Sequence, residues 1–183
     1  MRHFAGLLLV LAVMTGSLFA QQASNPVTGT VRDILLPRQQ KNITAAVEEM
    51  PADKFGYKPT PDQMSFGHLV VHIIESNNAM CAKASDVAAP KVEDPKETDG
   101  KDKLVSALND SFDFCKAALA KADDAKLGDN ITVFGTMQGP RALALIALTS
   151  GWADHYGAAA IYLRLNGLLP PTAKSKSEAP SKK

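Results

Sequence analysis

His155 lies in the middle of the most apolar helical stretch of the chain, which runs from Arg141 to Leu169. Apolar residues share its face of the helix at helical spacing, namely Ala144, Leu148, Ala159 and Tyr162. The imidazole of His155 is therefore expected to face the core. A histidine in this position is either a neutral core residue with one hydrogen-bond partner or a metal ligand. Imidazole is a good ligand for zinc, nickel, copper and iron.

Two further histidines, His68 and His72, lie four residues apart on an upstream stretch with helical spacing. His72 falls on the border of the apolar side, next to Leu69, whereas His68 falls farther round, near Glu75. Two histidines at this spacing can chelate one ion, but an exposed pair is more often incidental. His72 is thus the better candidate for a ligand at the mouth of a cleft between helices.

Other chemistries have little support in the sequence. Ser111 and Ser150 are not accompanied by a convincing His-Asp arrangement, and the sequence places no basic group so as to favour a reactive thiolate at Cys81 or Cys115. The sequence has no phosphate-binding glycine loop and no dinucleotide fingerprint. The candidate chemistry is therefore that of the histidines.

The two cysteines, Cys81 and Cys115, are the only ones in the chain. In an exported protein an even pair can be oxidised, and a bridge here would contribute about 4 kcal/mol in the chain-entropy model. Two buried thiols are the alternative. The spacing does not decide between them.

The first twenty residues are typical of a secretory signal peptide, with Arg2 at the start, an apolar segment and small residues before Gln21. The apolar segment is too short to span a membrane, so we expect an exported protein, periplasmic or secreted, without a stable membrane span. Removing residues 1–20 takes away one of the 20 basic residues and leaves 19 against 19 acidic ones. A nearly neutral chain is not expected to bind nucleic acid.

The rest of the chain is rich in Ala and Leu and has few β-branched runs, which favours helices. After a flexible lead-in at 21–29, the periodicity predicts four long amphipathic helices and no convincing strand. Their approximate ranges are 30–50, with a kink at Pro37, then 66–85, 103–122 and 141–169. The sequence therefore predicts an all-α four-helix bundle over residues 30–172, followed by a disordered charged tail at 173–183.

Three blocks of sequence follow one another in this frame, in the order PADKFGYKPTPDQMSF, SFGHLVVHIIESNNAMC and DHYGAAAIYLRLNGLLPP. Together they resemble the DinB family of bacterial four-helix proteins, over about residues 27–172. The chain is particularly similar to exported members with paired cysteines at positions like Cys81 and Cys115. The resemblance implies an up-down-down-up bundle and association into a homodimer.

The resemblance also implies a divalent-metal site of three histidines, one from the second helix and two from the last helix in an H-x-x-x-H arrangement. The first maps onto His72 and the last onto His155. The remaining ligand maps onto Gly151, which has no side chain, and the glutamine common after H-Y-G is replaced by Ala158. We therefore expect a degenerate site, in which His68 or Asp154 is a substitute ligand.

Two functions are consistent with this pattern. The first is a non-catalytic or weakly metal-binding envelope or stress-related module, whose apolar cleft takes a small-molecule ligand. The second is a metal-dependent hydrolase or thiol transferase of DinB type, with Zn, Ni or Fe held by His72 and His155. In both, the cleft between the second and last helices is expected to be lined by Met80, Trp152 and Tyr156.

Overall fold

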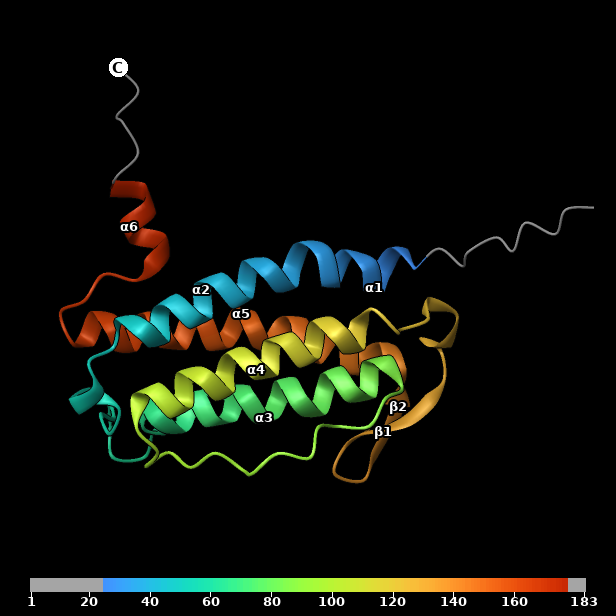
Figure 1. Ribbon diagram of the computed structural model, residues 1–183, viewed down its shortest axis with the longest axis horizontal. Coiled ribbons are helices and arrows are strands. Elements are labelled where there is room, and N and C mark those ends of the chain that lie inside the picture. The colour runs from blue at the N-terminus through green and yellow to red at the C-terminus, as the bar shows by residue number, and fades with distance from the viewer. Residues whose placement is uncertain (1–24, 178–183) are drawn as a thin grey trace, which may run out of the picture.

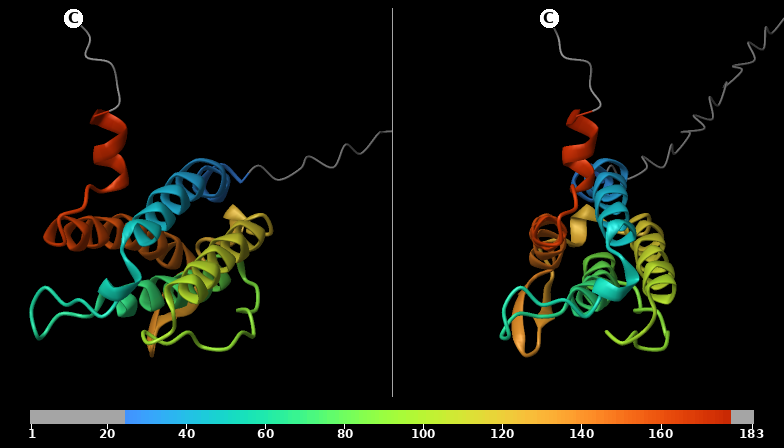
Figure 2. Two further views of the ribbon diagram at one scale, coloured as in Figure 1. Left: turned by 60° about the vertical axis from the view of Figure 1, so that its left-hand side comes forward. Right: turned by 90° about the vertical axis from the view of Figure 1, so that its left-hand side faces the viewer.

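Four long helices pack side by side in the computed structural model, which describes residues 25–177 (Figure 1). They are α2 (Leu36–Glu49), α3 (Phe66–Ser85), α4 (Lys101–Leu119) and α5 (Arg141–Leu165). Helices α2 and α5 run in one direction and α3 and α4 in the other (Figures 1 and 2). The predicted all-α four-helix bundle is confirmed. The expected signal peptide, residues 1–20, lies outside the described residues.

The order of the helices around the bundle brings α3 against α5, the two helices that carry His72 and His155. Helix α3 packs between α4 and α5, and α2 contacts the same two helices from the opposite side. Because α3 and α4 are parallel, residues 86–100 must return along the whole bundle, as Figure 1 shows. The core between the helices is filled by large buried side chains, including Phe66, Phe112, Trp152 and Leu163.

The first helix begins earlier than expected. Helix α1 (Pro26–Thr30) and a π-helical segment, η1 (Val31–Leu35), lead directly into α2. Helix therefore replaces the last part of the flexible lead-in expected at 21–29. The π-helical turn ends just before Pro37, whose missing N–H and bulky ring disturb the preceding turn, so the kink expected there is a widened turn.

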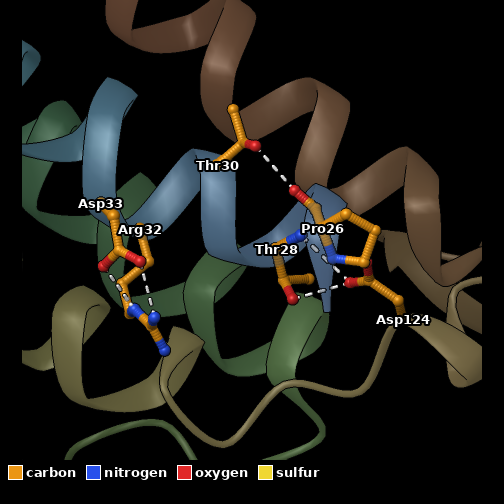
Figure 3. Close-up of polar contacts among 6 residues, drawn as sticks. All are labelled: Pro26, Thr28, Thr30, Arg32, Asp33 and Asp124. Atoms are coloured by element: carbon orange, nitrogen blue, oxygen red, sulfur yellow. Dashed lines mark hydrogen bonds and ion pairs between the residues drawn. The ribbon is translucent and has the colours of Figure 1, made fainter. Parts of the chain in front are cut away.

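Asp124, far away in the sequence, holds the start of α1 in place (Figure 3). It lies in a short 3₁₀ turn, η3 (Asp124–Lys126), and its carboxylate accepts bonds from the Val27 N–H at 2.7 Å and the Thr28 N–H at 3.0 Å. The Thr28 hydroxyl donates to it as well, at 2.7 Å. A carboxylate on the free N–H groups of a helix start acts as a cap, here supplied by another segment. No local pattern in residues 21–29 announces this cap.

The connection between α4 and α5 contains a β-hairpin that the periodicity did not predict. Strand β1 (Asn130–Phe134) pairs antiparallel with β2 (Met137–Pro140), and Gly135 in the turn has a φ of +49°. Both strands are short, and Val133 is the one residue in them that is buried. Such a hairpin has too little alternation of apolar and polar residues for its strands to be recognised from the sequence.

The end of the described chain also differs from expectation. Residues Pro171–Ser177 form a helix, α6, which extends into the segment 173–183 that was expected to be disordered. Its first turn is held to α5 by Tyr156, whose hydroxyl donates to Thr172 Oγ1 at 2.8 Å and accepts from the Thr172 N–H at 3.1 Å. Lys174 Nζ reaches Glu49 at 2.5 Å. None of the helices within residues 25–177 combines the length and the apolarity that a membrane span requires.

Candidate functional site

His72 of α3 and His155 of α5 lie against each other. Their ring centroids are 5.0 Å apart and the ring planes are nearly perpendicular, at 84°. Helix α3 keeps its predicted range because Ser65 caps it, accepting a bond from the His68 N–H at 3.0 Å. The start of α3 at this cap fixes the position of His72 along the helix. The packing of α3 on α5 then places the exposed His72 ring beside the half-buried ring of His155.

The histidine pair separates two cavities. The inner cavity has a volume of about 190 Å³, and its wall includes Asn77, Met80, Phe134, Gly151 and Trp152 beside the two histidines. The outer cavity is more open, at about 420 Å³, and is lined by the same histidines together with Asp62, Gln63, Leu69, Asp154 and Tyr162. A ligand in either cavity would therefore contact both imidazoles.

The environment of His155 keeps its ring neutral. Burial is the largest influence on its pKa and, with the nearby His72, lowers it from 6.5 to about 4, while Asp154 opposes the shift. Its Nδ1 atom is buried and has no hydrogen-bond partner. An unpaired buried polar atom is unfavourable by about 1–3 kcal/mol, and such atoms are uncommon in folded proteins. At neutral pH, His155 is therefore a neutral imidazole with an unused nitrogen.

A buried polar network fixes the floor of the inner cavity. The Trp152 indole N–H donates to Asn77 Oδ1 at 2.7 Å, and Asn77 Nδ2 donates to Ser111 Oγ at 3.0 Å. The Ser111 hydroxyl in turn donates to the Leu108 carbonyl at 2.7 Å. Asn77 was not among the residues predicted for the site. The signal was available, because an asparagine among the inward positions of an apolar helix needs a buried partner.

The other residues expected at the site are not all brought together. Met80 and Trp152 line the inner cavity, but Tyr156 lines neither cavity and instead bonds to Thr172. Asp154 lines the outer cavity beside both histidines. His68 is exposed, lies 3.7 Å from Glu97 and lines neither cavity.

Cys81 and Cys115 form a disulfide, which decides between the two states left open by the sequence. The bond joins α3 to α4, with the Cα atoms 5.1 Å apart and both residues fully buried. Cys81 follows Met80 of the inner cavity directly in sequence. The disulfide thus stabilises the helix that carries His72.

The spacing of the two imidazoles suits a shared metal ion. An ion bound to imidazole lies about 2 Å from the nitrogen and roughly 3 Å from the ring centroid, so two rings on one ion have centroids about 5 Å apart. The third donor is missing, because Gly151 lies beside His155 without a side chain. Within residues 25–177, no group of three or more His, Cys, Asp or Glu side chains is placed to hold one ion. Two of the three positions that the resemblance implies as ligands carry a histidine here, His72 and His155.

A side chain at position 151 would fit the available space. A Cβ built on Gly151 lies 3.5 Å from Cε1 and 3.9 Å from Nδ1 of His155, which are ordinary contact distances. Gly151 also forms part of the wall of the inner cavity. Position 151 therefore has room for a Cβ in van der Waals contact with the His155 ring, in the wall of the inner cavity.

Comparisons with known proteins agree with this architecture. The family profile described as the DinB superfamily matches residues 35–156. A DinB-like protein from Bacillus subtilis is 20% identical with a TM-score of 0.59, over 73% of this chain and 89% of that one. A DinB-like protein from Bacillus cereus is 14% identical with a TM-score of 0.60, over the same shares. No curated protein matches the chain. The family match covers most of the chain and includes both histidines, and the protein belongs to the DinB superfamily.

Proposed function

We propose that this protein is an exported DinB-like binding module, whose His72–His155 pair takes a small ligand and keeps weak affinity for a divalent metal ion. The observation that carries the proposal is the cavity of about 190 Å³ whose wall includes both Gly151 and His155. The buried Nδ1 of His155 has no hydrogen-bond partner. An unpaired polar atom beside a cavity suits a ligand with a hydrogen-bonding group.

Weak metal binding follows from the number of donors. A catalytic zinc ion usually has three protein ligands and one open position, whereas this chain offers two imidazoles. The neutral state of His155 at pH 7 favours coordination, because only the unprotonated nitrogen binds a metal. Two ligands hold an ion loosely unless the bound small molecule supplies the third.

A metal-dependent hydrolase or thiol transferase is the alternative, and the convergence of the two imidazoles favours it. In that case an ion held by His72 and His155 would lower the pKa of a bound water or thiol. The residues of this chain would orient the substrate, with Trp152 and Met80 contacting its apolar part in the inner cavity. Asp154 would face it from the outer cavity.

Metal titration of three variants distinguishes these functions. Wild type, Gly151→His and Gly128→His are purified without chelator and titrated with Zn²⁺ and Ni²⁺ by isothermal calorimetry, with elemental analysis of the proteins as isolated. Gly128 is the matched control, since it is exposed in the connection between α4 and α5, lines neither histidine cavity, and a Cβ there meets nothing within 4 Å. Both variants thus replace a glycine by a histidine, but only one adds it at the pair.

For a binding module, we expect weak metal binding by wild type and at least about tenfold tighter binding by Gly151→His, which corresponds to roughly 1.4 kcal/mol. Gly128→His should behave as wild type. Near-stoichiometric metal in isolated wild type, lost in His155→Ala, would favour the enzyme instead. Equal affinities of Gly151→His and Gly128→His would exclude an inherited pocket.

We also propose that the protein forms a homodimer through one face of α5. Four exposed apolar or small residues lie within one arc of the helix, namely Ile146, Ala153, Gly157 and Ile161, and the polar Ser150 and Arg164 are exposed in the same arc. The two isoleucines expose 61% and 55% of their surface. Large apolar side chains exposed on one side of a helix suit a partner that covers them.

A further inference from the structure

A separate polar cavity lies where α3 ends and α5 begins, at the opposite end of α3 from His72. Its volume is about 190 Å³. The wall is formed by the last turn of α3, the residues after α4 and the first residue of α5. Its lining residues are Ala84, Ser85, Asp86, Val87, Lys121, Asp123, Lys126 and Arg141. Neither histidine of the first site contributes to it.

Arg141 is the most buried charged residue of this wall, with 5% of its surface exposed. Nη1 donates to the Lys83 carbonyl at 2.6 Å, and Nη2 lies 3.2 Å from Asp86 Oδ1. Nε is buried and has no partner. The guanidinium thus joins α5 to the end of α3 and keeps one donor unused.

Ser85 supplies a second unused group. It is 4% exposed, and its buried Oγ has no hydrogen-bond partner. Lys121 lies at the exposed rim, and no hydrogen bond or ion pair involves its ammonium group among the described residues. Two buried orphan atoms in one cavity wall are unusual, because such groups are normally paired.

The carboxylates of the wall already have partners. Asp86 lies between Lys126, at 3.3 Å, and Arg141, and these cations lower the pKa of its carboxyl. Asp123 accepts a bond from the Ala125 N–H at 3.0 Å. Asp129 is 3.9 Å from Arg141 but does not line the cavity. The wall thus has three cations against two carboxylates, and its buried unpaired atoms, Arg141 Nε and Ser85 Oγ, can both donate, which suits an oxyanion.

A mostly apolar cavity of about 440 Å³ adjoins the polar one, since the two share Asp86, Val87 and Arg141. The rest of its wall is largely apolar, with Ala79, Ala82, Ala89 and Ile131. The one additional cation there, Lys83, already donates to the Val133 carbonyl at 2.5 Å. A ligand that spans both cavities would have an anionic head and an apolar body.

We propose that these joined cavities form a binding site for a small amphipathic oxyanion, such as a short alkyl phosphate. Its head lies between Ser85, Lys121 and Arg141, and its body lies over the apolar wall. The site is independent of the histidine pair, so neither proposal depends on the other.

Calorimetric titration with four probes tests the site: hexyl phosphate, hexyl sulfate, inorganic phosphate and neutral hexanol. We expect saturable binding of both hexyl esters, weaker binding of inorganic phosphate and none of hexanol. Because Arg141 holds α3 to α5, its removal could unfold the protein, so the test variants are Lys121→Glu and Ser85→Ala. Lys58→Glu is the matched charge control, on an exposed lysine in the connection before α3.

Lys121→Glu should weaken hexyl phosphate binding by about tenfold, since it reverses a charge close to the head group. Lys58→Glu should leave binding unchanged, and Ser85→Ala should weaken it without changing the net charge. Equal loss in Lys121→Glu and Lys58→Glu would overturn the site, as would failure of every anionic probe to saturate. Equal affinity for inorganic phosphate and hexyl phosphate would contradict binding of the alkyl chain in the apolar cavity.

Discussion

Breaking the disulfide between Cys81 and Cys115 should destabilise the protein strongly. The bond closes a loop with a sequence separation of 34 residues between two buried positions. For a loop of this length, the chain-entropy model gives about 4 kcal/mol at 25 °C. In a domain of this size, that loss lowers Tm by roughly 10 °C.

The most direct test of the disulfide compares oxidised and reduced wild type, because both sulfur atoms remain in the protein. Wild type is unfolded in urea and by heat, with and without dithiothreitol, and the free thiols are counted in denaturant. The double variant Cys81→Ala/Cys115→Ala serves as the control, because dithiothreitol should not change its stability. The variant itself loses about 1 kcal/mol more from the small cavities left in the core.

The expected result is no free thiol in oxidised wild type and a drop in Tm on reduction. The helices should remain, since the buried contacts of α3 with α4 and α5 do not depend on the bond. Two reactive thiols in the protein from an oxidising compartment would refute the reasoning. If reduction by dithiothreitol lowers Tm by less than about 2 °C, the segment between the two cysteines is already constrained in the unfolded chain.

Three further predictions concern the bundle and its surface. In the presence of chelator, stability should fall as the pH drops from about 6.5 toward 4, because the unfolded His155 gains a proton that the folded ring, with its pKa of about 4, does not; His155→Asn should flatten this dependence in urea titrations. Asn77→Ala should lower the free energy of unfolding by about 2–3 kcal/mol, since it leaves the Trp152 indole N–H unpaired, and a double-mutant cycle with Trp152→Phe should show coupling. Ile161→Glu should convert a dimer to a monomer in light scattering, whereas unchanged mass in both Ile161→Glu and Ile146→Glu would exclude this face.

Much of the histidine site could be predicted from local pattern. The apolar stripe around His155 and the border position of His72 depend only on helical periodicity, which is visible in the spacing of apolar residues along the sequence. The resemblance to a family added the pairing of the two helices. The place of Tyr156 could not be predicted, because it depends on α6, a short helix whose position is set by tertiary contacts.

The same limit explains the segments that differed from expectation. The start of α1 is held by Asp124, a residue about a hundred positions later, and no nearby residue can signal such a partner. The β-hairpin has one buried side chain, Val133, so its hydrophobic pattern is nearly absent. Periodicity detects long amphipathic elements and misses short ones held by distant contacts.

By itself, the sequence determined the four helices, the inward-facing His155 and the absence of a side chain at Gly151, because each follows from residue type and spacing along one helix. Tertiary structure alone decided that the two imidazoles lie 5.0 Å apart, that Cys81 meets Cys115, and that Arg141 and Ser85 share a cavity wall. These are distances between elements, and they are set by how the helices pack rather than by any local preference of the chain.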